Sequence, residues 1–155
     1  MRKNMQIGLS VSYMPIRSPS TKVGGLVHFG RMLDKIRAHA KEELAEDYQA
    51  NLGKGFDGYC TRFLRVDYDE LVEHVEQGGT DDEILQWCFK KGRRPDEDEI
   101  YVWNEFMRKR GWNDEISETL NRRKKEAGMA GRSEIETMFA FIDADEGRSV
   151  TGNHL

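Results

Sequence analysis

The chain has 155 residues, a length that allows one domain with a substantial core and argues against two. Charged residues make up 34% and aromatic residues 10%, which is too aromatic for a disordered chain. The net charge is -4, and two cysteines are too few for a disulfide scaffold or a four-thiolate zinc site. No apolar run approaches the ~20 residues of a membrane helix, so we expect a cytoplasmic protein with no membrane association.

The N-terminal segment is basic but does not have the pattern of a signal peptide. Polar residues interrupt every apolar run, so the hydrophobic region that such a peptide needs is missing. We interpret residues 1–17 as an N-terminal arm that is extended or loosely held. The domain proper is predicted to span residues 18–148, followed by a tail at 149–155.

Charge is distributed unevenly along the chain. The first 40 residues carry seven basic side chains and one acidic one, whereas the remainder carries 17 basic and 27 acidic ones. A basic segment on an acidic body indicates either an anionic partner or a first helix that packs against acidic neighbours. The basic run at 122–125 ends a predicted helix, where cations favour the helix dipole. With a pI of 5.6, nucleic acid is an unlikely partner.

Hydrophobic periodicity and capping signals predict an all-α fold, a single-domain irregular bundle of about seven helices. The first runs from about 24 to 44, where apolar residues recur every three or four positions. The others are expected at about 56–64, 67–77, 81–91, 95–110, 114–127 (capped by Asn113 or Asp114) and 133–142. Thr80 with Glu83, and Ser133 with Glu136, have the spacing of a capping box.

The first predicted helix carries a line of basic side chains. His28, Arg31, Lys35 and His39 follow each other at steps of three or four residues, which places them on one face, opposite the apolar stripe. Their mutual repulsion must be offset by acids from another helix, by water or by a bound anion. This face is either solvated, with Asp34 pairing locally, or a binding site in which Arg31 grips a carboxylate or phosphate.

A glycine-rich loop at 51–58 precedes the second predicted helix. Its flexible glycines let backbone N–H groups converge just before a helix N-terminus, and Lys54 adds positive charge, which is the chemistry of an anion cradle. The alternative is a turn that needs positive φ at two positions. It is not a P-loop, because the GKS or GKT ending is absent.

Metal and cysteine chemistry have little support. The four histidines, His28, His39, His74 and His154, include no pair at i, i+4 and none at finger spacing from a cysteine. We therefore expect no metal and no cofactor. Cys60 and Cys88 fall on apolar helical faces, as buried structural thiols do.

These features favour a binding or interaction module whose cation-lined site takes an anionic small molecule or a protein partner. The predicted site comprises His28, Arg31, Asp34, Lys35, His39, Asn51, Lys54 and Asp57. The alternative is a small-molecule enzyme in the same pocket, with His28 or His39 as the acid/base, Asp34 or Asp57 as its orienting partner and Arg31 as the anion clamp. A third hypothesis is a homodimer in which the polar helix at 114–127 packs across the interface.

Several strings together resemble a family of small bacterial helical proteins that is catalogued as a domain of unknown function. They are RSP (17–19), KVGG (22–25), RMLDKIR (31–37), NLGKGFD (51–57), GGTDDEIL (78–85) and DEGR (145–148). The resemblance implies a compact cytosolic protein and no particular activity. Family members commonly have a Gly-Glu-Leu-Pro run after the first helix, where this chain has EELA (42–45). This departure predicts a slightly longer first helix.

Overall fold

The structure is a computed structural model and describes residues 13–150. These residues form eight α-helices and contain no strand beyond an isolated bridge between Val23 and Leu26. The helices are α1 (Phe29–Ala40), α2 (Glu46–Gln49), α3 (Phe56–Leu64), α4 (Tyr68–Glu76), α5 (Asp81–Lys91), α6 (Glu97–Lys109), α7 (Ser117–Glu126) and α8 (Met138–Asp145). The predicted all-α class is confirmed, and α2 is an additional short helix that periodicity did not indicate.

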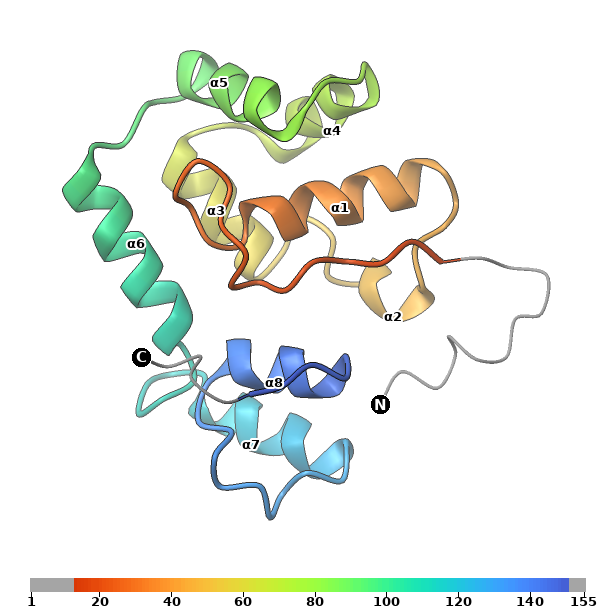
Figure 1. The fold of residues 1–155 in the computed structure, drawn as a ribbon, viewed down its shortest axis with the longest axis vertical. Coiled ribbons are helices and arrows are strands. Elements are labelled where there is room, and N and C mark those ends of the chain that lie inside the picture. The colour runs from red at the N-terminus through yellow and green to blue at the C-terminus, as the bar shows by residue number, and fades with distance from the viewer. Residues whose placement is uncertain (1–12, 151–155) are drawn as a thin grey trace.

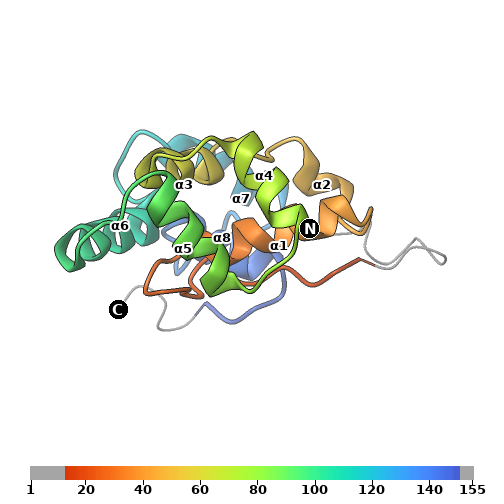
Figure 2. The ribbon, with the colours of Figure 1, turned by 90° about the horizontal axis from the view of Figure 1, so that it is seen from above.

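The helices form two groups joined by α6 (Figure 1). The larger group contains α1 to α5, and its core includes Phe29 and Leu33 of α1 with Leu64 of α3 and Leu71 of α4. The smaller group pairs α7 with α8 through a second apolar cluster that includes Leu120. The view from above shows α6 flanking the other helices (Figure 2). Phe139 of α8 belongs to the larger core, so the two groups also pack against each other directly.

The first helix is shorter than the predicted span of 24–44. At its start, Gly24 and Gly25 adopt positive φ values of 57° and 85° in a tight turn in which Val23 and Leu26 exchange backbone hydrogen bonds. A Cβ atom on Gly24 would lie 2.2 Å from Leu85 Cδ2, so the turn also needs glycine for close packing. The helix begins only after His28.

The C-terminus of α1 is a Schellman motif, which explains why the helix stops at Ala40. The Glu43 N–H donates to the Ala38 carbonyl, and the Glu42 N–H donates to the His39 carbonyl. Glu42 occupies the position that favours glycine, with φ 58°. The prediction of a longer first helix from the EELA string is therefore wrong. Glu42 adopts the left-handed conformation that glycine usually occupies at the end of a helix.

We expect Glu42→Gly to raise the free energy of unfolding by about 0.5–1 kcal/mol. The substitution removes a left-handed cost of ~1–2 kcal/mol, which exceeds the ~0.5–1 kcal/mol that glycine loses in chain entropy. Thermal unfolding followed by circular dichroism should show a midpoint higher by roughly 1–4 °C. Glu43→Gly is the control, because its φ is not positive, and it should lower the midpoint. An equal effect of the two changes would contradict this account.

The last two helices begin later than predicted. Asp114 does not cap α7; it accepts hydrogen bonds from the Gly111 N–H and the Arg110 guanidinium in the preceding turn. Ser133 is exposed and does not cap α8. Thr137 does so, and its Oγ1 accepts from the Ala140 N–H at 3.1 Å. By contrast, the capping box of Thr80 with Glu83 is confirmed at the start of α5.

The last part of the predicted arm is packed against the domain. The Met14 N–H donates to the Glu43 carbonyl, Ile16 is buried, and Arg17 pairs with Asp34 of α1. Residues 13–17 therefore belong to the folded body. The predictions for 1–12 and for most of the tail fall outside the described residues.

Candidate functional site

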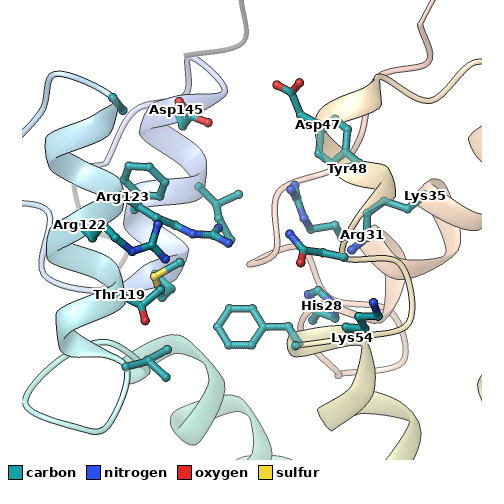
Figure 3. Close-up of a pocket in the computed structure, with 18 of the residues that line it drawn as sticks. His28, Arg31, Lys35, Asp47, Tyr48, Lys54, Thr119, Arg122, Arg123 and Asp145 are labelled. Carbon is teal, nitrogen blue, oxygen red and sulfur yellow. The ribbon is translucent and has the colours of Figure 1, made fainter.

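A cleft of about 530 Å³ lies between α1–α3 and the α7–α8 pair (Figure 3). One wall consists of His28, Arg31, Lys35, Asp47, Tyr48, Asn51, Lys54, Gly55, Phe56 and Tyr59. The other consists of Ile116, Thr119, Arg122, Arg123, Glu126, Ala127, Met138, Phe141, Ile142 and Asp145. Sites for small molecules have volumes of roughly 300–1,000 Å³, so the cleft is large enough for one.

The cleft brings together most of the residues that the sequence singles out. His28, Arg31, Lys35, Asn51 and Lys54 all line it, and Asp57 lies directly behind His28 and Lys35.

Two of the predicted site residues lie elsewhere. Asp34 binds Arg17, with Oδ2 2.9 Å from Nε, and does not line the cleft. His39 is exposed on the last turn of α1 and does not line it either. Of the four basic residues expected on one face, only His28, Arg31 and Lys35 therefore line the cleft.

Asp57 of α3 is the buried centre of the inner wall. Its Oδ1 lies 2.8 Å from Nε2 of His28 and 3.0 Å from Nζ of Lys35, and its side chain has no exposed surface. Oδ2 accepts a hydrogen bond from the Gly53 N–H at 3.1 Å. Burial acts to raise the pKa of Asp57, but the hydrogen bond from His28 and the charge of Lys35 outweigh it and lower the pKa to about 2. The glycine loop thus directs this N–H at an internal carboxylate.

His28 presents an unsatisfied ring nitrogen. Burial lowers its pKa, so the ring is neutral at neutral pH. Because Nε2 donates to the ionised Asp57, Nδ1 carries no proton and is a hydrogen-bond acceptor. Nδ1 is buried and has no partner among residues 13–150. The backbone of His28 has φ 71°, a strained conformation for a non-glycine residue that costs on the order of 1–3 kcal/mol.

Arg31 is already bound to an internal carboxylate. Its two terminal nitrogens donate to the two oxygens of Glu146 at 2.9 and 2.7 Å, and the Tyr48 hydroxyl donates to the same carboxylate. Burial acts to raise the pKa of Glu146, but the bonds and charge of Arg31, together with Arg148, lower it to about 2. The repulsion along α1 is therefore offset by acids from other elements. The sequence carried no signal for the pairing of Arg31 with Glu146, because 115 positions separate them.

Arg123 of α7 is the functional candidate that sequence reasoning missed. Within the run 122–125, Arg122 lies at the exposed edge of the cleft and pairs with Glu126. Nζ of Lys124 donates to the carbonyls of Arg132 and Ile135. Arg123 is half-buried and lines the cleft. Among buried and half-buried Lys and Arg residues of the described chain, it alone has no carboxylate or carbonyl partner.

Metal binding, cysteine reactivity and membrane insertion have less support in the part of the chain that the structure describes. That part contains no group of three or more His, Cys, Asp or Glu side chains that could hold a metal ion. Cys60 and Cys88 are free and buried, as predicted, and burial raises the pKa of both thiols, that of Cys88 to about 12. Between residues 13 and 150, no helix has the length and apolarity to cross a membrane.

Fold and site together define a small all-α protein with a basic cleft between two groups of helices. The chain belongs to the family described as Domain of unknown function (DUF5069), whose model matches residues 13–148. The resemblance to a domain of unknown function is thereby confirmed. No curated protein matches the chain.

Proposed function

We propose that this protein binds a small anionic molecule, one that carries a phosphate or carboxylate group, in the cleft between α1–α3 and α7–α8. The observation that supports it is Arg123, a half-buried guanidinium without an internal acid. The other buried and half-buried basic residues between 13 and 150 each have a carboxylate or carbonyl partner within the fold. A guanidinium presents paired N–H donors that match phosphate and carboxylate geometry.

The charges around Arg123 favour binding of an anionic group at one end of the cleft. In Figure 3, Lys54 and Thr119 lie at the lower end, Asp47 and Asp145 lie at the upper end, and Arg123 lies between them. Lys54 is exposed and makes no ion pair with any residue in 13–150. We therefore expect the anionic group to lie between Arg123 and Lys54, with its remainder against Phe56.

A second candidate function is catalysis in the same cleft by an acid–base pair. The contact between Nε2 of His28 and Asp57, at 2.8 Å, favours it, because a carboxylate that orients a histidine leaves the other ring nitrogen free to take a proton. His39 and Asp34 do not line the cleft, so the pair reduces to His28 and Asp57. Any reaction would require the ligand to bind first, so binding is the function to test.

The experiment compares Arg123→Ala with Lys125→Ala, a control on the same helix whose side chain is exposed and does not line the cleft. Wild-type protein is screened by thermal unfolding against inorganic phosphate, sugar phosphates, nucleotides and carboxylates. A ligand at 100 times its Kd adds ~2.7 kcal/mol, which raises the midpoint by roughly 5–10 °C. Calorimetry with the strongest ligand should show at least about tenfold weaker binding for Arg123→Ala, since a hydrogen bond to a charged group contributes ~1.5–3 kcal/mol.

Lys125→Ala should bind like the wild type. Arg123→Ala should also unfold at the wild-type midpoint without ligand, because Arg123 has no internal acid to leave unpaired. The proposal fails if no anion shifts the midpoint, or if the two variants lose affinity equally.

A further inference from the structure

We infer that the anion bound in this cleft also carries a hydroxyl group, which donates a hydrogen bond to Nδ1 of His28. The ligand class is therefore a phosphorylated or carboxylated alcohol, such as a sugar phosphate or a hydroxy acid. This inference rests on the proposed function and specifies its ligand. It is supported by the position of His28, which contributes to the same cleft as Arg123.

The tautomer of His28 is determined by its neighbours. Nε2 lies 2.8 Å from Oδ1 of Asp57, and the same oxygen lies 3.0 Å from the Lys35 ammonium. The carboxylate is ionised and only accepts hydrogen bonds, so the imidazole must carry its proton on Nε2. The other nitrogen is then an acceptor that requires a donor.

No residue of the described chain supplies that donor. Nδ1 of His28 is buried without a partner, and the nearest aromatic ring, that of Phe56, is edge-on with its centroid 5.8 Å from the imidazole centroid. An unpaired buried acceptor is unfavourable, because it loses its hydrogen bond to water without gaining another. The cost adds to the backbone strain at φ 71°, so two unfavourable terms coincide at one residue that lines the cleft. Such coincidence is typical of a binding residue.

The surroundings of His28 favour a hydroxyl group over an apolar ligand. Phe56, Met138 and Phe141 supply apolar surface to the cleft but no side-chain donor. Nδ1 is already buried and unpaired without a ligand; a hydroxyl that reaches it would satisfy it, whereas an apolar ligand would leave it unpaired. Sites built to bind a hydroxyl discriminate strongly against analogues that lack it, because the polar group of the protein is then left without a partner.

The test uses calorimetry with two probes of equal length, glycerol phosphate and propyl phosphate. Wild-type protein should bind glycerol phosphate at least about tenfold more tightly. His28→Gln keeps an N–H donor toward Asp57 and removes the acceptor at the Nδ1 position. We expect this variant to bind both probes with the lower affinity. Equal binding of the two probes by the wild type, or unchanged discrimination in His28→Gln, would overturn the inference.

A second measurement needs no substitution. Nitrogen-15 NMR of the histidine rings should show Nδ1 of His28 unprotonated in the free protein, and its resonance should shift with glycerol phosphate but not with propyl phosphate. A protonated Nδ1, or equal shifts with the two probes, would contradict the inference. Failure of the proposed function looks different: neither probe binds, and Arg123→Ala has no effect.

Discussion

Replacing Asp57 with alanine should lower the free energy of unfolding by about 3–5 kcal/mol, the cost of removing one partner from a buried ion pair. The substitution leaves the Lys35 ammonium, whose side chain is 9% exposed, without its carboxylate, and it removes the acceptor for Nε2 of His28. For a protein of this size the unfolding midpoint should fall by roughly 6–20 °C. Denaturant unfolding at neutral pH measures the loss.

Lys35→Met tests the reason for that loss. In the double variant with Asp57→Ala, no charge remains unpaired at this position, so the protein should be more stable than Asp57→Ala alone. If the two substitutions destabilise additively, Lys35 and Asp57 do not act as a pair, and the electrostatic description of the inner wall is wrong.

Acidification should remove a contribution of about 3 kcal/mol that comes from Glu146. Its pKa is about 2 in the folded protein, against 4.5 when free, because the bonds and charge of Arg31 outweigh the effect of burial. A lowered folded pKa means that the contribution is complete above about pH 4.5 and is lost as the pH falls toward 2. Asp57, with a folded pKa of about 2, acts in the same direction. Denaturant unfolding at a series of pH values measures the slope.

Glu146→Gln isolates this residue. The amide has no carboxyl proton to bind, so the variant should be less stable than the wild type at pH 7 and should lose less stability between pH 4.5 and 2. The same pH slope in both proteins would show that the Arg31 pair does not control acid stability.

The fold class could be predicted from local sequence signals. Helix boundaries could be predicted only where the residues at a helix end formed a cap among themselves. Thr80 with Glu83 starts α5 as predicted because the cap is made within four residues. Ser133 and Thr137 are both acceptable N-caps, and the selection of Thr137 is a tertiary effect: the Met138 N–H, one residue beyond it, donates to the Arg110 carbonyl. The end of α1 was misplaced because Glu42, rather than glycine, occupies the left-handed position.

The site was predictable on one wall and not on the other. Spacing along α1 and the glycine loop located His28, Lys35 and Lys54, which all line the cleft. The partners of the buried cations could not be predicted from local sequence, since Glu146 binds Arg31 across 115 positions. Arg123 was not predictable either. A run of four basic residues does not show which side chain will be half-buried without an acidic partner once α7 packs on α8.

The most direct test of the central claim observes Arg123 itself. The Nε–H resonances of the arginine side chains can be followed by NMR while inorganic phosphate is added, with Arg123→Lys used to assign the signal. The account predicts a saturable shift of the Arg123 signal, while that of Arg132, which does not line the cleft, stays in place. An Arg123 signal that does not move, or that moves only in parallel with the exposed arginines, would contradict an anion site in this cleft.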